Sequence, residues 1–344
     1  MLLRPALIAF ACGSLLNVHA EGLDATAVVK GWQSQQLGRV QTLQASSLVL
    51  KDSVDALCKR LGNSEIRAAR QAWLQTYVAW RAVEALPMGP ALSRRTAWQI
   101  DAWPVKPQKV EEAVRLVERD APIADSVGAN AQGLPALEYL LWGDDRASAQ
   151  LGRLHFRQRC QYAQALAADV ATEAQSLQQD WQGYSSTALD ADAGRQAFEE
   201  AVNLIAGSVE ALRDKKVGRL GSPKLTQKPT RQIFDAWRSH GTHAGMAATL
   251  NALEQLFLDN RQAPSFVDRL AVEKPLLAQH LREEFAIARE HLAKLPADMA
   301  ASAAAKPASV QPFLDSIKKL QGIIELQVAD AVGVTIGFKD SDGD

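Results

Sequence analysis

The amino-acid sequence predicts an all-α protein, and three observations carry this prediction. Apolar residues recur at steps of three and four in almost every long segment, the spacing that places them on one helix face. No segment shows the sustained alternation of apolar and polar residues that is typical of strands. Residues that begin and end helices stand at the borders of these segments. Amphipathic helices of this kind pack as antiparallel bundles.

Four apolar stripes are the clearest, and we expect them to face the core. They are Val40, Leu43, Ser47, Leu50, Val54, Leu57 and Leu61; Phe156, Cys160, Ala163, Ala167, Val170, Ala174, Leu177 and Trp181; Phe198, Val202, Ile205, Val209 and Leu212; and Phe313, Ile317, Leu320 and Ile324.

Two helices also carry end signals. Asn63-Ser64 are expected to cap a helix whose first turn carries Glu65, and Gly89-Pro90 to end it. Gly133-Leu134-Pro135 are expected to begin a short helix that ends at Gly143, because proline loses nothing in a first turn.

The N-terminus has the features of a secretory signal. Arg4 supplies the positive charge, Ala6 to Leu16 the apolar stretch, and Val18-His19-Ala20 the cleavage site. Residues 1–20 are therefore expected to be removed, which predicts a periplasmic protein. A lipid anchor on Cys12 is the alternative, although the residues before Cys12 fit a lipidation signal poorly. The mature chain lacks a run of about eighteen apolar residues, so we expect no transmembrane segment.

A stretch rich in Ser, Thr and Asp, from Tyr184 to Asp192, is the best candidate for a linker. It divides the mature chain into two halves of similar length, which predicts an N-terminal helical bundle over 21–185 and a C-terminal one over 190–344. Two cysteines remain after export, Cys58 and Cys160. They form either one disulfide, as an oxidising compartment allows, or two buried thiols.

Charge excludes some classes of function. The 344 residues include 38 Lys and Arg against 39 Asp and Glu, a net charge of -1, so no strong field favours nucleic acid or an anionic membrane. The basic stretch from Arg213 to Arg231 is rich in Gly and Pro and is expected to be a solvated loop. The acidic tail Asp340 to Asp344 resembles only the start of a calcium loop. The sequence contains no Gly-x-Ser-x-Gly motif of serine hydrolases, no phosphate-binding loop and no dinucleotide-binding motif.

Candidate functional residues are charges placed on apolar faces. Glu138 is the only charge between Pro135 and Trp142, so it must be hydrogen-bonded, paired, bound to a cation or protonated, unless it reaches the surface. Glu84 extends the inward-facing aromatic stripe of Trp73, Tyr77 and Trp80, where it either sits in a polar pocket beneath the aromatics or simply ends the stripe at the helix terminus. Asp101 and Trp103 follow a helix break, where they form either a pocket wall or an ordinary turn.

A histidine pair is the only other sign of a metal site. His240 and His243 lie three apart, which is acceptable spacing for two metal ligands if the segment is helical. Two ligands alone do not make a site, and the His-Glu-x-x-His motif of zinc peptidases does not occur.

Together these segments resemble the imelysin family, bacterial periplasmic and surface proteins also called the M75 peptidase or iron-regulated imelysin-like group. The matching pieces follow in order along the chain: the Trp-rich helix ending in Glu84, Ile100 to Pro104, Gly133 to Gly143, Trp237-Arg238-Ser239, and Gly337 to Asp344. The resemblance implies two helical domains, each related to a four-helix bundle, with a functional site between them. It also implies an association with iron uptake and, by name, peptidase activity.

The sequence departs from the family at one decisive position. The signature Gly-x-His-x-x-Glu is matched by Gly133 and Glu138, but Pro135 occupies the histidine position, and proline has no ligating side chain. Lys339 also stands where the family's terminal motif usually has asparagine. The metallopeptidase hypothesis therefore loses the histidine of its metal site.

Two functional hypotheses follow. The leading one is a non-enzymatic periplasmic protein that binds a small ligand, an iron or other divalent cation, or a partner protein in a cleft between the bundles. Its expected site residues are Gly133, Glu138, Glu84 and Asp101, with Trp80 and Trp103 as apolar walls and Arg238 paired to a carboxylate. The rival is a metal-dependent peptidase in which His240 or His243 joins Glu138 as a metal ligand. The third hypothesis is a structural or docking protein whose buried charges serve only packing.

Overall fold

The computed structural model describes residues 23–117, 128–144, 147–213, 231–259 and 265–337, and these residues form helices and connecting turns without a strand. The predicted signal, Cys12, most of the basic stretch and the acidic tail lie outside the described residues. The first part of the chain forms α1 (Ala25–Arg60), α2 (Asn63–Glu84), α3 (Pro90–Ser93), α4 (Thr96–Ile100), α5 (Pro107–Val117), α7 (Gly133–Trp142), α8 (Gln150–Arg153) and α9 (Arg157–Ser186). The second part forms α10 (Ala191–Ala211), α11 (Thr242–Leu258), α12 (Phe266–Glu273), α13 (Pro275–Ala293), α14 (Met299–Ala305), α15 (Gln311–Gly322) and α16 (Ala329–Ala331).

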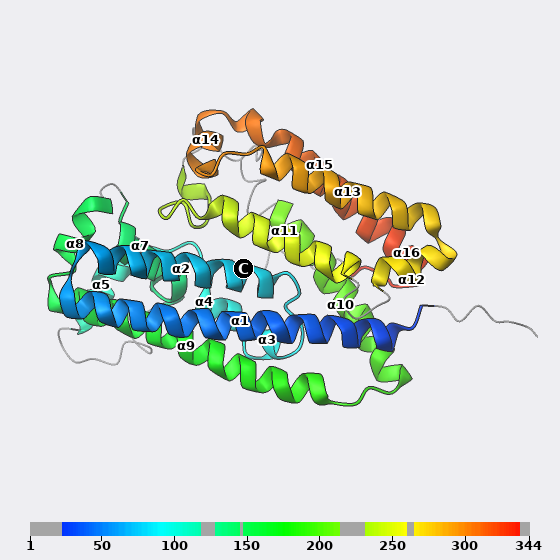
Figure 1. Cartoon of the computed structure of the whole chain (residues 1–344), viewed down its shortest axis with the longest axis horizontal. Helices are drawn as coiled ribbons and strands as arrows, with labels where there is room; N and C mark the ends of the chain where they lie inside the picture. Colours follow the sequence, from blue (N-terminus) through cyan, green and yellow to red (C-terminus); the bar gives the residue numbers. More distant parts are fainter. Residues whose placement is uncertain (1–22, 118–127, 145–146, 214–230, 260–264, 338–344) are drawn as a thin grey trace, which may run out of the picture.

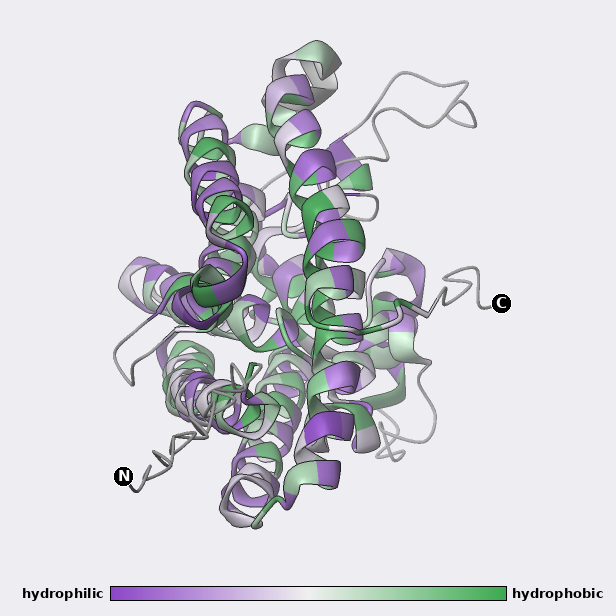
Figure 2. Cartoon of the chain, turned by 90° about the vertical axis from the view of Figure 1, so that its right-hand side faces the viewer, coloured by the Kyte–Doolittle hydropathy of each residue, from purple (hydrophilic) through white to green (hydrophobic). Residues whose placement is uncertain are grey.

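The long helices lie side by side along the longest axis of the molecule. Helix α1 packs against α2, α9 and α10, while α13 packs against α12 and α15. Helix α11 contacts α2 on one side and α13 on the other, so it joins the two groups of helices, as Figure 1 shows. Most helices carry hydrophobic and hydrophilic residues on different sides (Figure 2). The all-α prediction is therefore confirmed.

The predicted stripes are buried with two exceptions. Phe156 is 70% exposed, because it is the extended residue before α9 and does not share the face of the helix that follows. Leu61 is partly buried at the end of α1, where it adopts a left-handed conformation. All other apolar members of the four stripes lie in the core.

The predicted ends of α2 are wrong by a few residues. Gly62, not Asn63 or Ser64, is the N-cap, and it provides no side-chain hydrogen bond. Helix α2 ends at Glu84, and Pro90 then occupies the first turn of α3, so Gly89-Pro90 begin a helix instead of ending one. The prediction for α7 is confirmed at both ends, since α7 runs from Gly133 to Trp142 and is followed by Gly143 with a positive φ of 69°.

The expected linker contains a short helix break. Helix α9 ends at Ser186, and α10 begins at Ala191 with Asp190 as its N-cap. Because α1 contacts both α9 and α10, it packs against helices on both sides of this break. The division into two bundles at this point stays a prediction.

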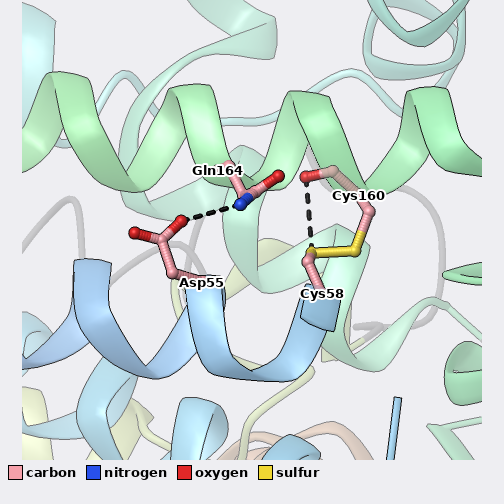
Figure 3. The surroundings of a disulfide bond; sticks show 4 residues. All are labelled: Asp55, Cys58, Cys160 and Gln164. Carbon is pink, nitrogen blue, oxygen red and sulfur yellow. Dashed lines mark hydrogen bonds between the residues drawn. A yellow bond between two sulfur atoms is a disulfide. The ribbon is translucent and has the colours of Figure 1, made fainter. Parts of the chain in front are cut away.

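A disulfide bond joins Cys58 to Cys160, with the two Cα atoms 5.7 Å apart. It connects the end of α1 to the start of α9 (Figure 3). One turn away, the side chain of Gln164 donates a hydrogen bond of 2.7 Å to Asp55, which links the same two helices. The first of the two alternatives for these cysteines is the correct one. Among the helices described, none is both long enough and apolar enough to cross a membrane.

Candidate functional site

A buried arginine on α2, Arg81, is the centre of a network of carboxylates. Its side chain is 1% exposed. One terminal nitrogen, Nη2, lies 2.6 Å from Asp101 and 2.5 Å from Asp235, while Nη1 contacts Glu84 three residues along the same helix. Asp101 and Asp235 are 5% and 4% exposed, so the network is shielded from water except at Glu84, which is 32% exposed.

These charges fix the ionisation of Arg81. Burial alone lowers the pKa of a guanidinium, but the neighbouring carboxylates, led by Asp101 and Glu84, raise the pKa of Arg81 well above its ordinary value. Arg81 is therefore always charged, and the carboxylates around it depend on that charge for compensation.

Two aromatic residues of α2 hold the network in position. The hydroxyl of Tyr77 donates a hydrogen bond of 2.9 Å to Asp235, and the Tyr77 ring lies 4.9 Å from the Arg81 guanidinium. Burial raises the pKa of Tyr77 well above its ordinary value, so the hydroxyl keeps its proton and remains a donor. The indole N–H of Trp80 points to Asp101 at 3.4 Å.

Glu138 forms a second centre beside the first. Its carboxylate is buried on α7, where Oε1 accepts hydrogen bonds from both the backbone N–H and the hydroxyl of Ser239, at 2.9 and 2.7 Å. Arg238 lies 3.9 Å from Oε2 and pairs more closely with Asp144, at 2.5 Å. Burial raises the pKa of Glu138 to about 7, against the opposing effects of Ser239 and Arg238.

Both centres lie where the two parts of the chain meet. Asp235, Arg238 and Ser239 belong to the turn before α11, whereas Arg81 and Glu138 belong to α2 and α7. Asp235 also contributes to the raised pKa of Glu138, so the two centres interact electrostatically. The turn has an unusual backbone, since Ala236 and His240 both have a positive φ, of 50° and 58°.

The other expected site residues occupy less direct positions. Gly133 has a φ of 68°, and a Cβ there would lie 2.3 Å from the carbonyl oxygen of Ile100. This close approach brings the start of α7 against the end of α4. Trp103 is half-buried, and its bond to Pro104 is cis. A ligand role for these residues, and for Glu138, Glu84, Asp101, Trp80 and Arg238, stays a prediction.

The residues that the structure describes do not fit a catalytic metal ion. Among the described residues, no group of three or more His, Cys, Asp or Glu side chains is arranged to hold one. Glu138 is engaged by Ser239, and His240, which is half exposed, pairs with Asp298 at 2.8 Å. His243 contacts the carbonyl oxygen of Leu292 at 3.0 Å, so the two histidines do not converge on Glu138.

Three network residues were not expected from the sequence as site residues: Arg81, Asp235 and Ser239. Arg81 carries a usable signal, because it follows Tyr77 by four residues and precedes Glu84 by three, and so lies on the same inward face of α2. Asp235 and Ser239 lie in an irregular turn, where no periodic pattern indicates which side chains point inward.

Comparison with known proteins places these observations in a family. The family model described as Imelysin (Peptidase_M75) matches residues 37–328. A relative from Synechococcus elongatus, named iron-regulated protein A, is 26% identical over 304 residues, which cover 83% of this chain and 79% of the relative.

Two solved structures have the same fold. An imelysin-like protein from Psychrobacter arcticum matches with a TM-score of 0.74 and 21% identity, over 91% of this chain and 98% of that one. A putative iron-regulated protein A precursor from Parabacteroides distasonis also matches with a TM-score of 0.74, at 14% identity, over 88% of this chain and 93% of that one.

Proposed function

Because the chain belongs to the imelysin family, we propose that it is an exported, non-catalytic binding protein that recognises a cationic ligand at the Arg81 network. The observation that carries this proposal is the convergence of Glu84, Asp101 and Asp235 from three separate segments on one buried arginine. We propose that the ligand binds in the inter-domain cleft predicted from the sequence, because the network lies where the two parts of the chain meet.

The energetics of the network support a role beyond stability. Removing Arg81, Asp101 and Asp235 from water costs several kcal/mol for each ion, and their mutual attraction barely repays that cost. Apolar residues of similar volume would hold the helices together at least as well. Clusters of this kind are common at functional sites, where charge is needed for recognition.

The exposure of Glu84 indicates the side from which a ligand approaches the network. Glu84 is the most exposed member of the network, and its partner Arg81 is fully buried behind it. A cationic group that reaches Glu84 from solvent meets a network in which three carboxylates share one guanidinium, and this excess of negative charge attracts it. We therefore propose Glu84 as the residue that contacts the ligand, with Arg81, Asp101 and Asp235 as its support.

An iron species is the first ligand to test, because one relative is named iron-regulated protein A. Since the described residues offer no set of three ligating side chains, a bare ion does not fit, and iron would arrive within a chelate of its own. A chelate with a net positive charge suits the carboxylates, whereas an anionic chelate does not.

The experiment is calorimetric titration of the mature protein with ferrioxamine B, a cationic ferric chelate, and with ferric citrate, an anionic one. We expect heat of binding from ferrioxamine B alone and at least tenfold weaker binding by Glu84→Gln. Glu112→Gln is the matched control, since Glu112 forms an exposed pair with Lys109 three residues away. Equal affinity of the two variants, or no binding of the cationic chelate, contradicts the proposal.

The peptidase alternative receives no support from the donor set. A zinc hydrolase needs about three protein ligands and an open position. Pro135 has no ligating side-chain atom, and His240 pairs with Asp298. We therefore assign no hydrolytic step to these residues, and we expect no chelator-sensitive cleavage of unfolded protein substrates.

A further inference from the structure

A cavity of about 460 Å³ lies between α1, α11 and α12. Its lining shares no residue with the Arg81 network or with Glu138, so it is a separate feature of the molecule. Cavities of this size bind small organic molecules. Nothing in the proposed function depends on it.

The polar side of the cavity carries two arginines, Arg39 and Arg269. Arg39 is 9% exposed, and its Nη2 donates a hydrogen bond of 2.7 Å to the carbonyl oxygen of Ala252. Its Nη2 donates longer bonds to the side-chain oxygens of Gln35 and Gln255, at 3.5 and 3.3 Å, and its Nη1 donates one of 3.3 Å to that of Gln36. Bonds of that length are weak, and a ligand anion would replace them with shorter charge-assisted bonds.

The charge of the lining favours an anion. Among the described residues that line the cavity, Arg39 and Arg269 are the cations, and Asp259 is the anion. A guanidinium matches the planar geometry of a carboxylate and can bind both of its oxygens.

The apolar side of the cavity is aromatic. Trp32 and Phe266 line it, and their rings are stacked with centroids 5.8 Å apart. The indole N–H of Trp32 donates a hydrogen bond of 2.6 Å to the carbonyl oxygen of Leu256, which fixes the ring. Trp32 and Phe266 are only 2% and 3% exposed, so they close the inner end of the cavity and a ligand meets a small part of each ring. An apolar inner end opposite polar groups suits a ligand with an apolar body and a polar head.

Two glycines of α1 keep the cavity open. Gly31 and Gly38 line it and lie seven residues apart, which places them on the same helix face. A Cβ on either glycine would meet no atom within 4 Å, so packing within the protein does not require them. Glycine is unfavourable in the interior of a helix. Its presence here, where no neighbouring atom requires it, leaves space that a larger side chain would fill.

From these observations we propose that the cavity binds a small organic carboxylate with an apolar body. The carboxylate contacts Arg39 and Arg269, and the apolar body fills the space beside Gly31 and Gly38, at the end closed by Trp32 and Phe266. The ligand thus spans α1 and α12, which lie far apart in the sequence.

The test is calorimetric titration of the mature protein with phenylacetate and indole-3-acetate, and with the corresponding neutral amides. We expect both carboxylates to bind and the amides to bind at least tenfold more weakly. Arg269→Gln should weaken carboxylate binding at least tenfold without changing amide binding. No binding of either carboxylate to the wild-type protein overturns the proposal.

A second variant tests the location of the site. The double variant Gly31→Leu and Gly38→Leu fills the cavity with good helix formers and should abolish binding while raising the temperature of unfolding. Gly207→Leu is the matched control, because Gly207 is an exposed glycine of α10 with open space around it. Undiminished carboxylate binding by the folded double variant overturns the proposed location, and so does unchanged binding by Arg269→Gln.

Discussion

Ser239 donates two hydrogen bonds to one oxygen of Glu138, one from its backbone N–H and one from its hydroxyl. Because Ser239 lies just before α11 and Glu138 lies on α7, this pair connects the two parts of the chain through a buried carboxylate. The same motif glutamate that the sequence placed on an apolar helix is thus held by a residue about a hundred positions away.

The ionisation of Glu138 should make stability depend on pH near neutrality. Its pKa in the folded protein is about 7, raised by burial above the ordinary value of 4.5. Between these two values the folded protein keeps a proton that the unfolded chain releases, so the free energy of unfolding falls as the pH rises. The full difference amounts to about 3 kcal/mol. It is present below pH 4.5 and lost as the pH rises through 7.

Glu138→Gln should remove this dependence, because a glutamine does not titrate. The measurement is urea unfolding of both proteins between pH 4.5 and 8, with the difference between their slopes as the readout. Carboxylates that do not interact with Glu138 titrate equally in both proteins, and Glu112→Gln provides an exposed control. Identical pH profiles for the wild-type protein and Glu138→Gln would contradict the prediction.

Loss of Arg81 should destabilise the protein strongly. Arg81→Met keeps the volume but leaves Asp101 and Asp235 buried without their central cation, which costs about 3–5 kcal/mol. The free energy of unfolding in urea measures this cost. Arg289→Met is the control, since Arg289 is mostly exposed and its pair with Glu254 should contribute less than about 1 kcal/mol. A similar loss of unfolding free energy in both variants would show that the buried carboxylates do not depend on Arg81 for charge compensation.

The sequence predicts those parts of the fold that leave a periodic pattern of apolar residues. The stripes of α1, α9, α10 and α15 were predictable because burial on one helix face leaves a repeating pattern. Phe156 fits the numerical spacing but precedes the first turn of α9, and spacing alone cannot show where a helix begins. Spacing alone does not show where a helix ends either, and α2 was therefore predicted to reach Gly89-Pro90.

The candidate site was predictable only in its helical parts. Glu84 and Glu138 were found because a charge on an apolar face breaks a regular pattern. Asp235 could not be found in this way, because its inward direction comes from a turn with two positive φ values before α11. Its pairing with Arg81 joins positions 154 residues apart, which no local pattern predicts.

The disulfide should contribute substantially to stability. Cys58 and Cys160 are 102 positions apart, and closing a loop of that length removes conformational entropy from the unfolded chain worth about 4–5 kcal/mol. The double variant Cys58→Ser and Cys160→Ser should lose most of this amount in urea unfolding. A reductant should destabilise the wild-type protein alone. Equal sensitivity of the variant to the reductant would contradict this assignment.

Gly133 should be intolerant of any side chain for a backbone reason. Its φ is 68°, and a Cβ would lie 2.3 Å from the carbonyl oxygen of Ile100. Both the left-handed conformation and the collision with rigid backbone penalise alanine, so Gly133→Ala should cost at least about 2 kcal/mol in the free energy of unfolding. The start of α7 would have to move away from α4, and the Trp73 indole would then lose its hydrogen bond of 2.9 Å to Leu134.

Gly207→Ala is the opposite case and serves as the control for Gly133→Ala. Gly207 lies inside α10 with open space around its Cα, so alanine should stabilise the protein by up to about 1 kcal/mol. Urea unfolding of the two variants should therefore shift in opposite directions from the wild-type protein. Tryptophan fluorescence of folded Gly133→Ala should change as well, because Trp73 stacks on Tyr77 and packs edge-on against Trp142. A neutral Gly133→Ala variant would mean that α7 can shift without cost, and that Glu138 is not rigidly positioned.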